Sequence, residues 1–137
     1  MRRSWVSEVF IWSSARIAGV PGLELLAQST QDREKYCREI EQEVRYANIT
    51  IIEGIGASQH GIGMVSARIA EIVVRDERLV IPIGSYNPNY GVTLSLPSVV
   101  GKDGVLQILE PEISEDERRA LQRSAETLKA ASARVRI

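Results

Sequence analysis

A glycine-rich stretch at residues 54–63, Gly-Ile-Gly-Ala-Ser-Gln-His-Gly-Ile-Gly, contains the side chains that could most readily do chemistry. Its four glycines permit close backbone approach and the positive φ angles that commonly end a helix. They leave the hydroxyl of Ser58 and the imidazole of His60 unshielded. Ser58 precedes a predicted helix, whose first backbone N–H groups favour an anion such as a carboxylate. The same serine is also explained as an N-cap with no ligand.

His60 is the single histidine of the chain. A lone histidine can act as a general base, but it can equally be a structural or surface residue. No group of cysteines, histidines or carboxylates has the spacing of a zinc site, so we predict no metal. The glycines do not follow a strand and therefore do not match a phosphate-binding loop.

Composition narrows the class of protein. The 137 residues are enough for one core, so we predict a single domain over residues 1–137. A formal charge of −1 argues against nucleic acid or an anionic membrane as a partner. The single cysteine, Cys37, cannot form an internal disulfide, and we interpret it as a small buried side chain in a cytoplasmic protein. No signal region or membrane-spanning run is found.

The elements that would position Ser58 and His60 follow from hydrophobic periodicity. Residues 8–12 are a β-rich apolar run that predicts a buried strand, and residues 13–22 predict a loop with a turn rather than a helix. Apolar residues then recur at helical spacing, which predicts one long helix from about 32 to 53. A second helix is expected to begin within the glycine stretch and to reach Asp76. The apolar positions of the long helix are Cys37, Ile40, Val44, Ala47 and Ile51.

The second half of the chain changes to a period of two. Residues 78–86, 92–100 and 105–109 predict three strands joined by short turns, and hence an antiparallel sheet. The prolines within the first two strands indicate edges or bulges. Ser114 and Glu117 match a capping box before a final helix with Leu121, Ala125, Leu128, Ser132 and Val135 on one side. The order of elements is strand, loop, two helices, antiparallel sheet and helix, an α+β class.

Several motifs carry a family resemblance. They are Ile-Trp-Ser-Ser-Ala-Arg-Ile-Ala-Gly-Val-Pro at 11–21, Gly-Ile-Gly at 61–63 with the helix after it, Tyr-Gly-Val at 90–92 leading to Leu-Pro-Ser-Val-Val-Gly at 96–101, and Ser-Ala-Glu-Thr-Leu-Lys at 124–129. From about Ser7 to Ile137 the chain resembles the C-terminal domain of the NAD-dependent lactate/malate dehydrogenase family, most of all the bacterial L-lactate dehydrogenases.

The resemblance implies an α+β domain with long helices packed on an antiparallel sheet, and no Rossmann domain in this chain. It implies NAD and a 2-oxo or 2-hydroxy acid substrate in the intact enzyme, with no cofactor expected on this chain alone. Family members carry a catalytic histidine in a Gly-Glu-His-Gly-Asp-Ser segment just before the position of Val9. Ser4 stands at that histidine's place, so the resemblance implies no catalytic residue in this chain.

Two site residues carry over from the family. Ser58 matches a position, often threonine, that lines the pocket beside the substrate side chain, and is the predicted substrate-binding residue. Ile62 matches an apolar residue that packs against the nicotinamide ring, and is the predicted cofactor-binding residue. His60 aligns with a non-catalytic position. Malate-specific members also vary at the position of Ser58, so malate dehydrogenase is the alternative activity.

We therefore expect the substrate-side domain of an L-lactate dehydrogenase, separated from its cofactor domain and inactive alone. The alternative from another class is a non-catalytic interaction or oligomerisation module derived from that domain. Without a cofactor domain, apolar surface around Phe10, Trp12 and Ile62 would be bare. We expect a homo-oligomer whose interface includes residues 9–12.

Overall fold

Alternating apolar residues form the central strand of a three-stranded antiparallel sheet. In a computed structural model, which describes residues 8–29 and 32–134, the sheet has the predicted order β3 (Leu79–Asn87), β4 (Val92–Gly101) and β5 (Gly104–Ile108). Every second residue of β4 from Val92 to Val100 is buried, which is the period of an extended strand. The turn between β3 and β4 is closed by the carbonyl of Asn87, which accepts the N–H of Gly91 at 2.8 Å, and Gly91 has a φ of 63°.

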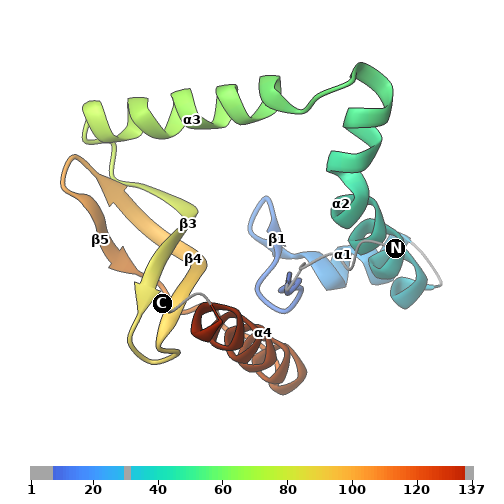
Figure 1. The fold of residues 1–137 in the computed structure, drawn as a ribbon. Coiled ribbons are helices and arrows are strands. Elements are labelled where there is room, and N and C mark those ends of the chain that lie inside the picture. The colour runs from blue at the N-terminus through green and yellow to red at the C-terminus, as the bar shows by residue number, and fades with distance from the viewer. Residues whose placement is uncertain (1–7, 30–31, 135–137) are drawn as a thin grey trace. The chain divides into compact units, whose positions relative to one another are not determined.

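Besides this sheet, the described part of the chain forms four helices and a short hairpin (Figure 1). Along residues 8–29 and 32–134, no helix combines the length and the apolar character that crossing a membrane requires. The elements, in chain order, are β1 (Arg16–Ile17), β2 (Val20–Pro21), α1 (Gly22–Ser29), α2 (Arg33–Ile55), α3 (Gln59–Val74), β3 (Leu79–Asn87), β4 (Val92–Gly101), β5 (Gly104–Ile108) and α4 (Glu115–Ala133).

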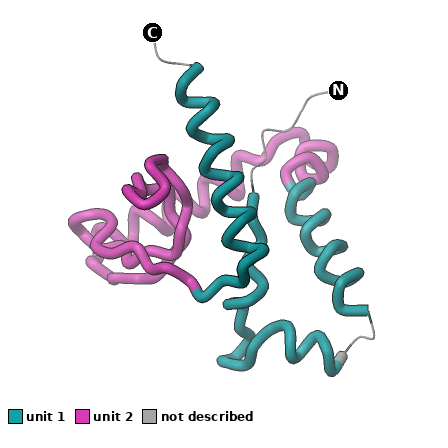
Figure 2. Tube along the Cα trace, turned by 90° about the horizontal axis from the view of Figure 1, so that it is seen from below, with its two compact units in different colours: residues 1–47, 112–137 teal, residues 48–111 magenta. Residues whose placement is uncertain are grey.

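The chain divides into two compact units (Figure 2). Unit 1 consists of Met1–Ala47 and Glu112–Ile137, and unit 2 is Asn48–Pro111. In unit 2, α3 contacts β4, and the most deeply buried apolar side chains are Ile72 on α3 and Val100 on β4. In unit 1, α4 buries Leu121, Ser124 and Ala125, whose spacing of three and four residues places them on one side of the helix.

The two prolines of the three-stranded sheet occupy positions where a missing N–H costs little. Pro82 and Pro97 are partners in the β3·β4 ladder. The carbonyl of Pro97 accepts the N–H of Leu109 at 2.8 Å, so the nitrogen and carbonyl of Pro97 point towards β5 and not towards β3. Strand β5 ends at Ile108, just before the residue opposite Pro97. The nitrogen of Pro82 consequently faces the open edge of β3. A bulge does occur in this sheet, but it involves neither proline: between the pairs Val99–Gln107 and Val100–Val105, Leu106 of β5 is the extra residue.

The two predicted helices around the glycine stretch are confirmed as α2 and α3. Gly56 follows α2 with a φ of 81°, and its N–H donates to the carbonyl of Ile52 at 2.8 Å. A glycine in the left-handed region is a common way to end a helix. The apolar side of α2 is not buried, however: Cys37 and Ile40 are half-buried, whereas Val44 is exposed. Periodicity located the helix, but it did not predict how little of the apolar side of the helix is buried.

The capping box at the start of α4 is also confirmed. The hydroxyl of Ser114 accepts the N–H of Glu117 at 3.3 Å, and the carboxylate of Glu117 accepts the N–H of Ser114 at 2.8 Å. Reciprocal bonds of this kind satisfy two backbone donors that a helix start otherwise leaves unpaired. Val135, predicted on the same helix side, lies outside the described residues.

The prediction of a buried strand at residues 8–12 is wrong. These residues have no regular secondary structure and are half-buried or exposed. A strand needs a neighbouring strand to accept and donate its backbone hydrogen bonds. Here the N–H of Trp12 donates instead to the carboxylate of Glu117 at 2.7 Å, and the indole Nε1–H donates to Glu41 at 2.9 Å. The guanidinium carbon of Arg45 lies 5.2 Å from the ring centroid of Phe10.

Helix α1 is not predicted by the sequence pattern, which indicated a loop and a turn before the long helix. The loop itself contains the little hairpin of β1 and β2, closed by the N–H of Gly22, which donates to the carbonyl of Ala15 at 2.7 Å. The eight residues of α1 follow directly. Two helical turns are shorter than the window in which helical periodicity is detectable, and a helix of that length depends on tertiary contacts.

Candidate functional site

Ser58 and Ile62, the two site residues implied by the family resemblance, lie one helical turn apart at the start of α3. Ser58 is the N-cap residue, and its carbonyl accepts the N–H of Ile62 at 3.4 Å. Residues at i and i+4 project from the same side of a helix, so both side chains belong to one face. Ser58 is half-buried, and the side chain of Ile62 is 64% exposed. This face therefore offers a hydroxyl next to open apolar surface.

The hydroxyl of Ser58 does not make a capping hydrogen bond. Its backbone, with φ −105° and ψ 9°, is not in the extended region that an N-cap serine normally adopts. Ser114, by contrast, has φ −66° and ψ 163° and caps α4 in the usual way. The structure thus confirms that Ser58 stands at the N-cap position, but capping does not account for its side chain.

His60 is exposed two residues after Ser58, so it projects to a different side of α3. Among the described residues, no three histidines, cysteines or carboxylates are placed to hold a metal ion. Cys37 is half-buried, and burial, followed by the nearby charge of Glu41, raises the pKa of its thiol. A raised pKa disfavours the reactive thiolate, in line with the interpretation of Cys37 as a packing residue.

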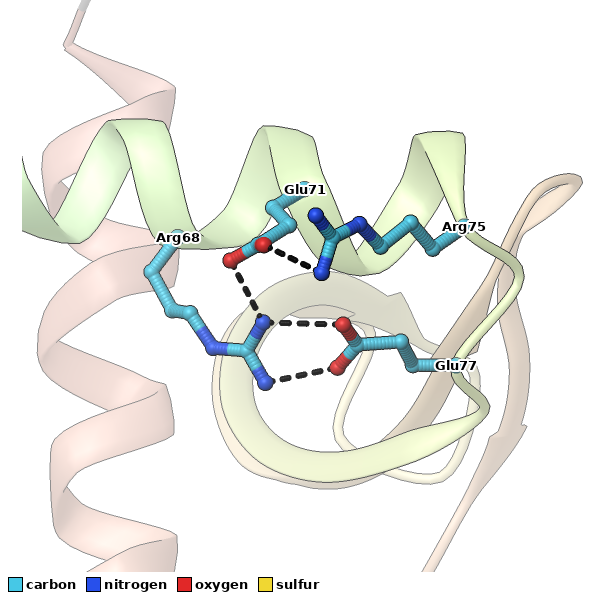
Figure 3. A network of polar contacts seen from close by, with 4 residues as sticks. All are labelled: Arg68, Glu71, Arg75 and Glu77. Atoms are coloured by element: carbon cyan, nitrogen blue, oxygen red, sulfur yellow. Dashed lines mark hydrogen bonds and ion pairs between the residues drawn. The ribbon is translucent and has the colours of Figure 1, made fainter.

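The far end of α3 is tied to the start of β3 by a network of ion pairs (Figure 3). The guanidinium of Arg68 binds both oxygens of Glu77, at 2.9 and 2.6 Å, and also Glu71 at 2.8 Å. Arg75 binds the other oxygen of Glu71 at 2.7 Å. A bidentate pair within a network has more geometric specificity than an isolated surface pair. The hydrogen bonds from Arg68 lower the pKa of Glu77, so this carboxylate stays charged.

A second contact fixes the same corner to the β4–β5 turn. Oδ1 of Asp76 accepts the N–H of Lys102 at 2.9 Å, and this hydrogen bond lowers the pKa of Asp76. Asp76 and Arg78 both have left-handed backbones, with φ of 50° and 51°. Non-glycine residues adopt that conformation where surrounding contacts impose it. The direction in which α3 carries Ser58 and Ile62 is therefore set at its other end, within unit 2.

Apolar side chains are exposed on both sides of the glycine stretch. Besides Ile62, Met64 is 74% exposed, and both belong to the first two turns of α3. Apolar surface that is left exposed commonly marks a site of interaction. The exposed large apolar residues of unit 2 in this region are Ile49, Ile51, Ile52, Ile55, Ile62, Met64 and Val65.

The other sequence predictions for the site have mixed outcomes. Ser4, at the place of the family's histidine, lies outside the described residues. Phe10 and Trp12, expected to be bare, are half-buried and have partners on α2. The residue that sequence reasoning missed is Glu117, which was interpreted only as part of a capping box. No sequence signal indicates that its carboxylate also binds the N–H groups of Trp12 and Ser13.

Comparisons with known proteins show the family of the chain. The family model for the lactate/malate dehydrogenase alpha/beta C-terminal domain matches residues 6–136. The L-lactate dehydrogenase of Deinococcus radiodurans is 44% identical over 124 residues, which cover 90% of this chain and 41% of that protein. The enzyme of Thermus aquaticus is 41% identical over 136 residues, covering 92% of this chain and 42% of that one.

A crystal structure of the minor L-lactate dehydrogenase from Enterococcus mundtii, in a ligands-bound form, matches the fold with a TM-score of 0.87. It is 30% identical, and the match covers 96% of this chain and 43% of that one. The chain thus spans about two fifths of the length of the curated relatives it matches. The predicted α+β fold is confirmed, and the chain belongs to the lactate/malate dehydrogenase family, matching its alpha/beta C-terminal domain.

Proposed function

We propose that this chain is the substrate-side domain of an L-lactate dehydrogenase, which interconverts pyruvate and L-lactate with NAD when joined to a cofactor domain. The observation that carries the proposal is its identity of 44% and 41% with two L-lactate dehydrogenases over nine tenths of this chain. The pairing of Ser58 with Ile62 on one face of α3 supports it. In this proposal the chain works in the cytoplasm.

The roles of the two residues follow from their chemistry. Ser58 offers a small polar side chain that does not cap its own helix, so its hydroxyl can lie beside the side chain of a 2-oxo acid. Ile62 presents exposed apolar surface one turn further on, which suits the flat face of a nicotinamide ring. The cofactor, when bound, supplies the hydride, and the protein supplies position and a water-poor surface.

We expect the isolated chain to be inactive. No residue of the chain is assigned an acid–base role, and the loss of such a group alone lowers a rate by about two to four orders of magnitude. The measurement is NADH oxidation at 340 nm with pyruvate and with oxaloacetate, compared with a buffer blank. Turnover that copurifies with the chain and survives Ser4→Ala would contradict this expectation.

A chimera tests the positive half of the proposal. The chain is fused behind the part of the Deinococcus radiodurans enzyme that it does not cover, and that enzyme's own residues are kept up to the junction at Ser7. If the proposal holds, the chimera reduces pyruvate, and Ile62→Lys impairs it more than His60→Ala does, because only Ile62 faces the ring. A folded chimera that binds NADH but reduces neither pyruvate nor oxaloacetate would refute it.

The second candidate function is a non-catalytic interaction module that self-associates. The observation that favours it is the exposed apolar surface at the ends of α2 and α3 that face the glycine stretch. Oligomerisation would cover such a surface at low cost. Light scattering at micromolar concentration should then show a homo-oligomer, and Ile55→Glu with Met64→Glu should dissociate it. A monodisperse monomer of the unmodified chain would exclude this function.

A further inference from the structure

Glu117 makes more hydrogen bonds than its capping role requires. Its Oε2 accepts the N–H of Ser114 at 2.8 Å, which completes the capping box of α4. Its Oε1 accepts two further N–H groups, from Trp12 at 2.7 Å and from Ser13 at 2.9 Å. These two donors are more than one hundred residues away in sequence. One carboxylate therefore joins the first helical turn of α4 to a segment near the beginning of the chain.

Within residues 8–29 and 32–134, no helix or strand anchors the backbone of the segment bound in this way. Residues 8–12 lack secondary structure, and the turn that follows them is closed by the N–H of Ala15, which donates to the carbonyl of Trp12 at 3.1 Å. Side chains of this segment make further contacts: the Trp12 indole with Glu41, and the Phe10 ring with Arg45. The N–H groups of Trp12 and Ser13 thus both donate to the same atom, Oε1 of Glu117.

The chemistry of this contact suits a carboxylate that stays charged. Burial of Glu117 raises its pKa, but the hydrogen bonds from Ser13 and Ser114 outweigh that effect, and the pKa is lowered. Bonds from N–H groups to an ionised carboxylate are stronger than bonds between neutral partners. No charged side chain is a partner of Glu117 within residues 8–29 and 32–134. The charged side chains on the elements around it are Glu8, Arg16, Glu41, Arg45, Glu115, Asp116 and Arg118.

We propose that Glu117 is a positioning residue that fixes the turn at Trp12–Ser13, and with it the path by which the chain enters the domain at Glu8. It acts through the backbone N–H groups of Trp12 and Ser13, and the side chain of Ser13 adds a further hydrogen bond. Its consequence for catalysis rests on the proposed function, in which the residues before Glu8 occupy the place of the family's acid–base segment. The hydrogen bonds themselves do not depend on that function.

The test is a pH titration of the ¹⁵N-labelled full chain by NMR. We expect the amide signals of Trp12, Ser13 and Ser114 to titrate together, with one midpoint below 4.5, the ordinary pKa of a glutamate. In Glu117→Gln this shared titration disappears, and amide hydrogen exchange of Trp12 and Ser13 at pH 7 becomes about tenfold to a hundredfold faster, as the loss of a charge-assisted bond implies.

Two control variants separate positioning from helix capping. Asp116→Asn removes a charge from the same helical turn, at a side chain that is 96% exposed, and should leave the amides of Trp12 and Ser13 unchanged. Ser114→Ala removes the capping hydroxyl but keeps the carboxylate, so the shared titration should persist while α4 is weakened.

Independent midpoints for Trp12 and Ser114 in the unmodified chain would overturn the proposal, even if Glu117→Gln fails to fold. Equal exchange changes in Glu117→Gln and Asp116→Asn would also overturn it. Neither measurement involves NADH or pyruvate, so failure of the chimera and failure of this titration remain distinguishable.

Discussion

Replacing Gly101 with alanine tests how tightly α3 is tied to the sheet of unit 2. A Cβ at Gly101 would lie 2.5 Å from Oδ1 of Asp76 and 3.1 Å from a methyl carbon of Leu106. Asp76 cannot move freely, because the same oxygen accepts the N–H of Lys102 at 2.9 Å. Overpacking of this kind costs about 1–3 kcal/mol. We expect Gly101→Ala to lower the free energy of unfolding of unit 2 by that amount.

A second glycine of the same sheet is the matched control. A Cβ at Gly84 would meet nothing closer than 3.7 Å, and its backbone is not left-handed. Glycine within a strand costs about 0.5–1 kcal/mol relative to alanine, so Gly84→Ala should be neutral or mildly stabilising. Amide hydrogen exchange of β4 residues measures the effect within unit 2, and urea unfolding followed by circular dichroism measures it for the chain.

The double variant of Gly101→Ala with Asp76→Ala identifies the cause. If the clash with the carboxylate is the source of the cost, removing that carboxylate relieves it, and the two changes are less than additive. Additive costs, or a Gly101→Ala variant as stable as Gly84→Ala, would refute the reasoning.

Two further changes test the site and its support. In the chimera, Ser58→Thr should change the preference between pyruvate and oxaloacetate, measured as the ratio of their kcat/KM values. The expected change corresponds to about 1–3 kcal/mol, the discrimination that one methyl group gives in a pocket. An unchanged ratio would show that Ser58 does not line the pocket. Arg68 lowers the pKa of Glu77, so the stability from this pair is present above pH 4.5 and is lost as the pH falls through the lower folded pKa. Below pH 4.5, the free energy of unfolding should therefore fall less steeply with decreasing pH in Glu77→Gln than in the unmodified chain. Identical profiles of stability against pH in the two proteins would contradict this.

Local sequence determined those elements whose stabilising partners are close along the chain. The capping box of Ser114 and Glu117 lies within one helical turn, and the turn from Asn87 to Gly91 is closed by its own residues. The three strands of the sheet follow one another directly, so their alternation was enough to predict the antiparallel order. The family motifs likewise placed Ser58 and Ile62 on α3, where i and i+4 spacing puts them on one face.

Only the tertiary structure decided the conformation and the burial of segments whose contacts are with residues far away in the sequence. Residues 8–12 have the composition of a strand, but the N–H of Trp12 binds Glu117 and no strand lies beside the segment within the described residues. Burial depends in the same way on what covers a surface, so the apolar period of α2 predicted its helix but not the exposure of Val44. Periodicity reports the conformation that a segment favours. Which other segment packs against it depends on turns that lie far away in the sequence, and no local pattern encodes these turns.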